Sequence, residues 1–541
     1  MNKTMKLFIF ILIMILSITP TILIIGYERE NINSKELSFS EEFEHNTFNI
    51  PDIQLNNIEI VIIFISILTF VIMVVNIILF LLPTVYIVPK WRLRLFLMII
   101  SLLIGFFLSS IVIYITNKYI LISQNDSSNK HYYQSYIVRP VGTLEIDDDA
   151  NISYKTYYGN DTDINTILIK SDNQVSLSNV TIHKRGNSSN VVSARTYGTN
   201  AGLLVLKDSA LNLKNSTIET HATGATGIFA TLDGSIINAD MTTIETTGTE
   251  SIGMSASLNG RINASNIKIK TSLSSSPAIS SLRNGSVSVS GAIIETNAQN
   301  SAIFQTSGEV NIDTSTGDAN ASLIAYVDGN GKVKISNSQL KAAGIKGTED
   351  GNDAGILIKR NVFNSNYKES ANVNIYKSLL KIKKQSRVYN KAPMFVVQNN
   401  NAIINIEDTN FIYGSSNFLM TINNTRNTEK PMLVVLNATN QKIDGNIVTD
   451  HGTSLEINLD KSNLKGTINN KNEMKKITLY MTEDSLLELT GDSYITTIED
   501  VDLSYSNIIS NGYTLYYDKD LNKNLKGVTI NLSDGGYIKG I

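Results

Sequence analysis

The residues of this chain that could support chemistry are few, and they are acidic or imidazole groups. The five histidines have no ligand spacing among themselves: His45, His131, His183, His221 and His451. Cysteine is absent, which excludes disulfides, zinc–thiolate sites and cysteine nucleophiles. The formal net charge of −3 gives a nucleic-acid partner no electrostatic support. The sequence therefore predicts neither a histidine metal centre nor a nucleic-acid interface.

Two short acidic motifs look like the first half of a calcium-binding loop. They are Asp161-x-Asp163-x-Asn165 and Asp518-x-Asp520-x-Asn522. Both lack the glycine at the sixth position and the glutamate at the twelfth that complete an EF-hand loop. We therefore expect turn residues at both places, and we predict no metal site and no cofactor.

Beyond about residue 160 the chain repeats, and this repeat must position any functional group. Three columns of residues keep one period of about 23 to 26 residues. The first column marks a turn: Ser209, Gly234, Gly260, Gly285, Gly308 and Gly331. The second marks a bend: Asn179, Asn215, Asp240, Asn266, Gly291 and Asn337. The third contains small residues: Gly202, Gly227, Gly253, Ala278 and Ala302.

The chemistry of the columns predicts the kind of repeat. Asn, Asp and Gly tolerate positive φ, so the second column indicates a recurrent left-handed bend between two short strands. The strands are alternating apolar runs such as Val287-x-Val289 and Val333-x-Ile335. No apolar stripe with a period of 3.6 appears after residue 120, which argues against helical repeats. The sequence predicts a parallel β-helix of about 13 to 15 coils, a rod on the order of 60–70 Å long.

The region from about 165 to 541 resembles bacterial right-handed parallel β-helix proteins of the pectin-lyase-like kind, in particular adhesin-like surface proteins and autotransporter passenger domains. The stretches that carry the similarity include "LKDSALNLKNSTIETHATGATGIFATLDGSII" and "NGSVSVSGAIIETNAQNSAIFQTSGEVNI". Asparagines at the bend, such as Asn215 and Asn266, match those that such helices often place there. The repeat is degenerate, so the resemblance speaks for the fold more than for the function.

The resemblance also implies what an enzyme of this fold would need. Polygalacturonase-like members use clustered aspartates with a histidine and a basic partner, and lyases use an aspartate-rich Ca²⁺ site with an arginine or lysine base. The nearest matches are Asp450-His451-Gly452 and Asp147-Asp148-Asp149. Neither has the basic partner motif, so we predict solvated turns and no catalytic residues.

Three apolar runs precede the repeats, at about 7–25, 60–82 and 95–115. Each is long enough to cross a hydrocarbon core of about 30 Å as a helix. The first run is either an uncleaved signal anchor or a signal peptide. None of the three runs contains an acid, a base or a histidine, so we expect an anchor and no transport pathway.

Charged residues predict the orientation of these spans. Lys3 and Lys6 precede the first span, and basic residues crowd the short link 90–94, whereas the loop 28–57 is acidic. By the positive-inside rule the N-terminus and the link are cytoplasmic. Everything after about residue 118 is then extracellular.

Tyrosines crowd both ends of the predicted β-helix. We expect them to cap the open ends, and sugar stacking on exposed rings is the alternative. The membrane-proximal group comprises Tyr132, Tyr133, Tyr136, Tyr154, Tyr157 and Tyr158. The distal group comprises Tyr513, Tyr516, Tyr517 and Tyr537.

These patterns together predict an all-β right-handed parallel β-helix preceded by three transmembrane helices. The domains are a membrane anchor (1–120), an extracellular linker with an N-terminal cap (121–160), and the β-helix with a C-terminal cap (161–541). The expected function is a multi-pass, cell-surface, non-enzymatic adhesin-like protein whose partner is a glycan or a host or envelope surface. An anchored polysaccharide lyase or glycoside hydrolase is the main alternative, and a purely structural spacer or assembly factor is the other.

Overall fold

The computed structural model describes residues 140–346, 352–360, 370–423, 431–473 and 476–541, and the backbone of strands at 48–53 and 133–138. The chain divides into two compact units, Met1–Val138 and Arg139–Ile541. The three predicted spans at 7–25, 60–82 and 95–115 lie outside the described residues. No helix within the described part of the chain is long and apolar enough to cross a membrane.

The first unit contributes one antiparallel pair of strands. β1 (Phe48–Ile53) pairs with β2 (Tyr133–Val138), and Ile50 lies opposite Tyr136. Pro51 lies within β1, which has no second neighbour among the described strands. An edge position tolerates proline, because its nitrogen has no hydrogen to donate.

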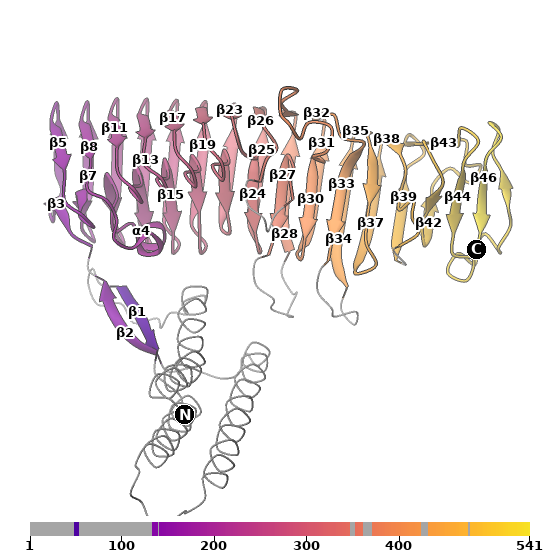
Figure 1. The fold of residues 1–541 in the computed structure, drawn as a ribbon, viewed down its shortest axis with the longest axis horizontal. Helices are drawn as coiled ribbons and strands as arrows, with labels where there is room; N and C mark the ends of the chain where they lie inside the picture. Colours follow the sequence, from indigo (N-terminus) through magenta and orange to yellow (C-terminus); the bar gives the residue numbers. More distant parts are fainter. Residues whose placement is uncertain are drawn as a thin grey trace, which may run out of the picture. The chain divides into compact units, whose positions relative to one another are not determined.

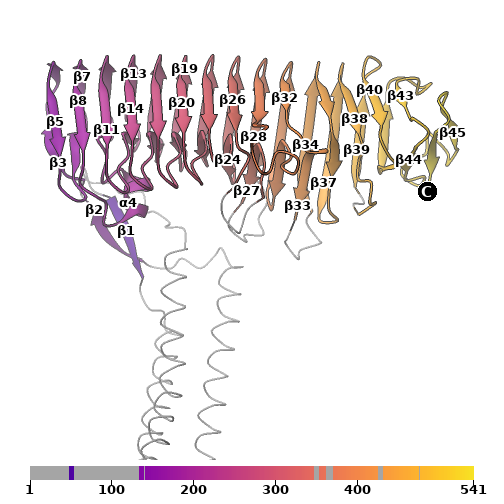
Figure 2. The same cartoon turned by 45° about the horizontal axis from the view of Figure 1, so that its top comes forward.

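The second unit is nearly all β and consists of long parallel sheets, an arrangement consistent with a parallel β-helix solenoid (Figure 1). Three consecutive strands make one coil, and equivalent strands of successive coils lie side by side along the long axis of this unit (Figure 2). At about 4.8 Å per coil, the 14 strands of its largest sheet span about 60 Å. The expected parallel, repetitive β-architecture is thus confirmed.

We name the three main sheets in the order in which each coil passes through them. Sheet 1 has 12 strands: β3 (Gly142–Ile146), β6 (Asn165–Ile169), β9 (Leu203–Val205), β12 (Ile228–Thr231), β15 (Met254–Ser257), β18 (Ile279–Ser281), β21 (Phe304–Thr306), β24 (Ala325–Asp328), β27 (Ile356–Lys359), β30 (Phe395–Gln398), β33 (Asn417–Ile422) and β36 (Asn446–Val448).

Sheet 2 has 14 strands and is the longest: β4 (Ala150–Ser153), β7 (Gln174–Ser178), β10 (Ala210–Lys214), β13 (Ile236–Asp240), β16 (Arg261–Ser265), β19 (Ser286–Ser290), β22 (Glu309–Asp313), β25 (Lys332–Ser336), β28 (Ser370–Tyr376), β31 (Asn401–Glu407), β34 (Met432–Thr439), β37 (Thr453–Asp460), β39 (Ile477–Met481) and β42 (Thr497–Asp500).

Sheet 3 has 10 strands: β5 (Thr156–Gly159), β8 (Thr181–Lys184), β11 (Thr217–Thr220), β14 (Thr243–Thr246), β17 (Lys268–Thr271), β20 (Ile293–Thr296), β23 (Thr316–Ala319), β26 (Gln339–Ala342), β29 (Leu379–Ile382) and β32 (Asn410–Ile412). The first coil, β3 to β5, lies within the segment 121–160 that the sequence analysis assigns to a linker and cap.

Two four-stranded sheets complete the distal coils. One contains β35 (Lys442–Asp444), β38 (Asn463–Gly466), β40 (Leu486–Leu489) and β43 (Ile508–Ile509). The other contains β41 (Ser493–Tyr494), β44 (Thr514–Tyr517), β46 (Tyr537–Gly540) and β45 (Ile530–Asn531). β45 runs antiparallel to β46, the last strand, and covers its outer edge.

The core is a set of apolar stacks inside the coils. In β10 the alternation Leu211-x-Leu213 turns both leucines inward, and both are fully buried. Ile218, Ile244 and Ile269 pair in register on successive strands of sheet 3 and form another stack. Because each apolar residue covers its equivalent in the next coil, the solenoid buries a continuous core without any long helix.

The bend between sheets 2 and 3 has the predicted left-handed conformation. Asn215 has φ 49°, Asn266 has φ 51° and Gly291 has φ 64°. The assignment of Asp240 to this column was wrong. Asp240 ends β13, and the next residue, Met241, makes the bend at φ 47°. Because methionine has no preference for a left-handed bend, the sequence pattern points to the aspartate one residue before the true bend.

The other two columns each contain one similar displacement. Register places Ser235, not Gly234, before the first residue of β13, and Ile303, not Ala302, before that of β21. Where the third column is glycine, the next coil lies close. A Cβ on Gly253 would lie 2.6 Å from the carbonyl oxygen of Ala278.

One helix interrupts the repeat, and the sequence pattern did not predict it. α4 (Val191–Tyr197) begins after Asn190, whose side chain accepts a hydrogen bond from the backbone N–H of Ser193. It ends at Gly198, which has φ 70°. Its Arg195 forms an ion pair of 2.7 Å with Glu250. At seven residues, the helix is too short to show a periodic apolar stripe.

Candidate functional site

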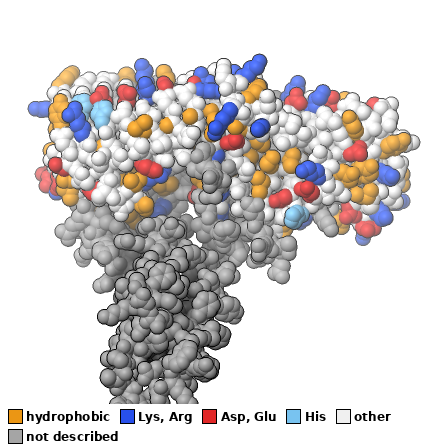
Figure 3. All heavy atoms as spheres, viewed as in Figure 1, with side chains coloured by type: hydrophobic (Ala, Val, Ile, Leu, Met, Phe, Trp, Pro, Cys, Tyr) orange, Lys and Arg blue, Asp and Glu red, His pale blue; other side chains and the backbone are white. Residues whose placement is uncertain are grey.

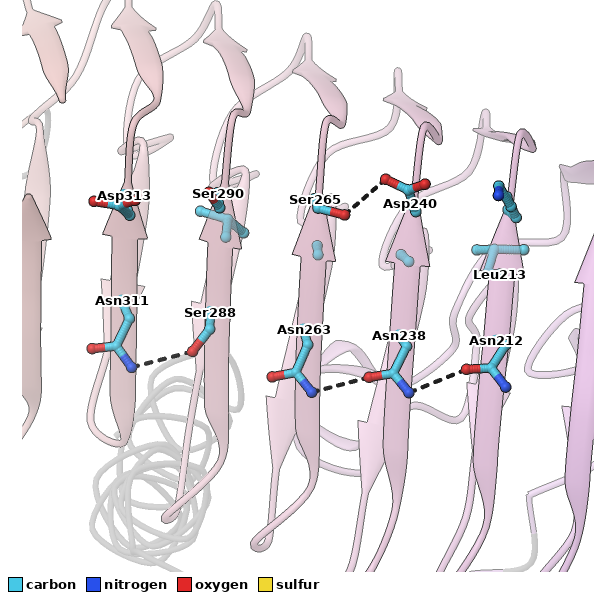
Figure 4. A pocket seen from close by; sticks show the side chains of 14 residues that line it. Asn212, Leu213, Asn238, Asp240, Asn263, Ser265, Ser288, Ser290, Asn311 and Asp313 are labelled. Carbon is cyan, nitrogen blue, oxygen red and sulfur yellow. Dashed lines mark hydrogen bonds between the residues drawn. The ribbon is translucent and has the colours of Figure 1, made fainter. Parts of the chain in front are cut away.

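A shallow groove of about 650 Å³ follows the outer face of sheet 2 across β10, β13, β16, β19 and β22 (Figure 4). Polar side chains border it, and core residues such as Leu213 and Val289 lie between them. The lining residues are Asn212, Leu213, Lys214, Asn238, Ala239, Asp240, Asn263, Ala264, Ser265, Ser288, Val289, Ser290, Asn311 and Asp313.

Strand alternation and register build this groove. Along β13, Ile237 and Ala239 point inward and are buried, so Asn238 and Asp240 point outward. The parallel register then sets the outward residues of each strand beside their equivalents in the next coil. The groove is consequently bordered by two rows of side chains, which Figure 4 shows running across the strands.

The first row is a ladder of side-chain amides. Asn238 donates to the Asn212 side-chain oxygen at 3.2 Å, and Asn263 donates to that of Asn238 at 3.0 Å. Further along, Asn311 donates to the Ser288 hydroxyl at 3.2 Å. An amide has two N–H donors and two oxygen lone pairs, and the ladder uses one of each on Asn238. On Asn238 one N–H donor and one oxygen lone pair stay outside the ladder, whereas Asn311 also donates to the Glu309 carboxylate at 2.9 Å.

The second row is polar and partly anionic. Asp240 accepts hydrogen bonds from the Ser265 hydroxyl at 2.7 Å and the Asn266 amide at 3.1 Å, and these hold its pKa below the ordinary value. Asp313 accepts from Ser336 and Asn337 in the same way, with the same direction of pKa shift. Both carboxylates therefore stay ionised at neutral pH, which suits hydrogen-bond acceptance and opposes a role as general acid.

The two carboxylates of the groove also lie far apart. Asp240 ends β13 and Asp313 ends β22, three strand spacings away in sheet 2, or about 14 Å. Glycosidase carboxylate pairs lie about 5 to 10 Å apart. The groove therefore offers hydrogen-bonding groups in a row and does not offer the paired acids of glycoside hydrolysis.

The acid–histidine motif of the sequence forms a turn. Asp450 accepts from the Thr453 hydroxyl at 2.7 Å and from the backbone N–H of Asn423. His451 next to it is exposed. The run Asp147-Asp148-Asp149 is also exposed, and its last carboxylate accepts from the backbone N–H of Gln174 at 2.7 Å. The structure does not bring these two motifs together with the groove.

The calcium-like motif at 161–165 is used for packing between coils. Asn165 is fully buried, donating to the Val141 carbonyl at 3.1 Å and accepting from the Ala201 N–H at 2.6 Å. The Asp163 carboxylate accepts from the hydroxyls of Ser188 and Ser189. The third ligand position of a calcium loop thus points into the protein.

The second such motif, at 518–522, is arranged alike. Asn522 is buried, donates to the Thr496 carbonyl at 2.7 Å and accepts from the Ile498 N–H at 3.0 Å. Asp518 accepts from the backbone N–H of Asp520 at 2.9 Å. Its carboxylate therefore fastens the turn.

Some of the tyrosines at the two ends are buried in the protein, and others are exposed to solvent. Tyr517 is fully buried and donates to the Val528 carbonyl at 2.8 Å, and Tyr157 packs against the core. Tyr494 and Tyr516 stack at 4.7 Å between ring centroids. Among the rest, the structure leaves Tyr154, Tyr158, Tyr513 and Tyr537 exposed, whereas Tyr132 and the side chains of Tyr133 and Tyr136 lie outside the described residues.

Two histidines that the sequence analysis treats as unrelated lie together. His183 and His221 both contact the Glu219 carboxylate on the outer face of sheet 3. The signal was hidden because the coil containing α4 is longer than the others: Ile182 pairs with Ile218, a separation well beyond the usual period. His45 and His131 lie outside the described residues.

No protein-family model, curated protein or solved structure matches this chain. What the site can do follows from its own chemistry. The first row of the groove on sheet 2 presents neutral donors and acceptors, and its second row adds the carboxylates of Asp240 and Asp313. Such a surface can bind an extended polar ligand through many weak contacts.

Proposed function

We propose that this chain is a membrane-anchored, extracellular, non-enzymatic surface protein that uses a right-handed, pectin-lyase-like β-helix for adhesion or envelope interaction. The amide ladder of Asn212, Asn238 and Asn263 is the observation that carries this proposal. The donor and acceptor that the ladder leaves unused on Asn238 complement the hydroxyl groups of an extended glycan, since each hydroxyl both donates and accepts. Several contacts of this kind along one ligand add through effective concentration.

The composition of the groove favours a neutral or weakly charged ligand. Lys214 at one end is balanced by Asp240 and Asp313 further along. A strongly acidic polymer would meet these two carboxylates, whose lowered pKa values keep them charged. We therefore expect neutral glycans to bind better than polyuronates.

The pairing of β1 with β2 supports the proposed topology. β1 lies in the loop 28–57 and β2 follows the third predicted span, and positive-inside charge assigns both to the outer side. Two strands can pair only when they lie on the same side of a membrane. The proposal therefore places the solenoid outside the cell, after a multi-pass anchor in the chain.

The experiment is a glycan-array and envelope-binding screen with the full chain in detergent. Asn238→Ala should weaken binding, because it removes the central member of the exposed ladder. Asn437→Ala is the matched control: Asn437 bonds to Asn405 and Asn458 at 2.7 Å in an equivalent ladder, but it is only half-exposed. Its loss should leave binding unchanged.

Two outcomes would contradict the proposal. Binding to nothing in the screen would favour a structural spacer. Release of new reducing ends or unsaturated products from pectate, alginate or hyaluronan, with or without Ca²⁺, would favour a lyase or hydrolase. That outcome would be decisive if turnover disappeared in Asp240→Asn, Asp148→Asn or Asp450→Asn.

A further inference from the structure

Two imidazoles and a carboxylate converge on the outer face of sheet 3, away from the groove. The Nδ1 atom of His183 lies 3.1 Å from Oε2 of Glu219, and Nε2 of His221 lies 3.7 Å from the same oxygen. One ligand atom from each residue falls within 4.8 Å of the others. Histidine side chains lie beside acidic ones in the region where Figure 1 labels β8 and β11 (Figure 3).

The solenoid itself creates this juxtaposition. His183 on β8 and Glu219 on β11 are register partners in neighbouring coils, so their side chains lie about 5 Å apart on one face. His221 lies directly after the end of β11, and its ring reaches the Glu219 carboxylate. The three ligands come from two coils, held by backbone hydrogen bonds that include His221 N–H to the Lys184 carbonyl at 2.8 Å.

A second contact holds the His221 ring in place. Its Nδ1 atom lies 2.8 Å from the Thr247 hydroxyl, which also lies 3.3 Å from the Thr220 carbonyl oxygen. In the tautomer that carries its hydrogen on Nδ1, the Nε2 lone pair is available to a metal ion beside the Glu219 carboxylate. The same device, a hydrogen bond on the far ring nitrogen, orients metal-binding histidines.

The His183 ring is also held in place. It stacks on Tyr158 with centroids 4.9 Å apart and an angle of 12° between the planes. Among the described residues no lysine or arginine forms an ion pair with Glu219, whose charge partners are the two histidines. The neighbour of Glu219 in the next coil is Glu245, which in turn faces Lys270 in the coil after that.

We propose that His183, Glu219 and His221 bind a divalent transition-metal ion of the Zn²⁺ class. Tetrahedral zinc with bonds of about 2.0–2.2 Å separates its ligand atoms by about 3.3 Å. The two distances to Glu219, 3.1 and 3.7 Å, lie on either side of that value, and the two histidine ligand atoms lie within 4.8 Å of each other. Two imidazoles favour zinc and its neighbours over Ca²⁺ and Mg²⁺, which take oxygen ligands.

The exposure of the ligands shows where the coordination stays open. The His183, Glu219 and His221 side chains are 19%, 34% and 42% exposed. Three protein ligands and this exposure leave the fourth position to water or to a donor group from outside. A bound ion would tie β8 to β11 and so stabilise the first coils by mass action.

The test is a zinc titration of the tag-free full chain in detergent after chelator treatment, read by competition with a chromophoric chelator. We expect one equivalent of Zn²⁺ to bind in the wild type, and none at this site in Glu219→Gln or His221→Ala. His451→Ala, which removes an exposed histidine elsewhere, should keep that equivalent. Thr247→Val should weaken binding about 10- to 100-fold, because it frees the ring of His221.

Zinc uptake that is the same in wild type, Glu219→Gln and His221→Ala would overturn the proposal, and so would no uptake in the wild type. A circular-dichroism melt of each variant distinguishes lost binding from lost folding. X-ray absorption of the zinc-loaded chain gives an independent readout, which should show two imidazole nitrogens. A zinc coordination shell without imidazole would also contradict the assignment.

Discussion

Sheets 2 and 3 are built from the same coils, yet their outer faces have different chemistry. The face of sheet 2 is a row of amides that bond to one another, such as Asn238 to Asn212. The face of sheet 3 is a row of charged groups, where Lys341 pairs with Asp318 at 2.9 Å and His183 meets Glu219 at 3.1 Å. Register stacks whatever residue occupies a column, so one core supports a row of amides on one face and a row of charged groups on the other.

The two faces also differ in how they satisfy their polar groups. An amide carries both donor and acceptor, so identical residues can form a ladder of any length. Like charges directly opposite each other destabilise a sheet. The charged column of sheet 3 mixes both kinds of neighbour: Asp318 faces Lys341, whereas Glu219 faces Glu245 beside the two histidines.

The largest effect is expected from a substitution in the apolar core, which lies beneath both faces. Ile244 is fully buried between Ile218 and Ile269. Ile244→Ala should lower the free energy of unfolding by about 2–5 kcal/mol, because it leaves a cavity in the stack. Urea denaturation of the full chain measures this. Glycan binding at sheet 2 and zinc binding at sheet 3 should both weaken at intermediate urea, and loss of only one would show that the faces do not share a core.

The next effect depends on pH and concerns the first coils under sheet 3. Burial lowers the pKa of Lys184 to about 8, even though its ammonium donates to the Asp161 and Gly186 carbonyls at 2.8 and 2.7 Å. Between pH 8 and 10.5 the unfolded chain holds this proton and the folded chain releases it. The stability of the wild type relative to Lys184→Met should therefore rise by about 1 kcal/mol per pH unit in that window.

This pH effect is measured by urea denaturation of both proteins at several pH values. The difference between the two removes the contributions of tyrosines, which titrate in the same range. A difference that stays constant, or that falls as the pH rises, would contradict the burial of a titrating lysine. Below pH 8 both the folded and the unfolded chain hold this proton, so the difference in stability between wild type and variant should no longer depend on pH.

Substitutions at the bend between sheets 2 and 3 should change stability less, and in opposite directions at two positions. Asn266 has φ 51°, so Asn266→Val should destabilise the fold by about 1–2 kcal/mol. Met241 has φ 47° at the equivalent bend, so Met241→Asn should stabilise it by up to about 1 kcal/mol. Thermal denaturation of both variants beside the wild type measures the pair. Equal destabilisation by the two changes would disprove the equivalence of the bends.

The smallest effect separates the two amide ladders of sheet 2. Asn238 is exposed, so Asn238→Ala should cost less than about 1 kcal/mol, since water replaces the lost bonds. Asn437 is half-buried, and its replacement leaves Asn405 and Asn458 less able to reach water. Asn437→Ala should cost about 1–2 kcal/mol. The same denaturation experiment compares the two variants, and a larger loss of stability in Asn238→Ala than in Asn437→Ala would contradict this explanation.

Sequence patterns predicted the parallel, repetitive β-architecture because its causes are local. Alternation such as Leu211-x-Leu213 turns side chains inward, and asparagines such as Asn266 make the bend. The prediction failed where the local signal was missing. Met241 bends the chain without a bend residue, and α4 adds length to one coil with only a capping residue, Asn190, to mark it.

The groove was only partly predictable. An outward polar face that includes Ser288 follows from alternation, but the amide ladder requires the register of five strands. The three spans at 7–25, 60–82 and 95–115, and the topology drawn from their flanking charges, stay predictions. The burial of each tyrosine at the two ends could not be predicted. Tyr517 packs inward and Tyr158 stays exposed, although both have similar neighbours in the sequence.

The sequence by itself determined the period of this protein, the inward and outward sides of its strands, and the bends that asparagine or glycine marks. Only the tertiary structure decided which outward residues meet. His183 and Glu219 are 36 residues apart in a chain whose usual period is near 25, because α4 lengthens the coil between them. Backbone hydrogen bonds between coils set this register. Which outward side chains meet therefore depends on the length of each coil, and a local sequence pattern does not contain that length.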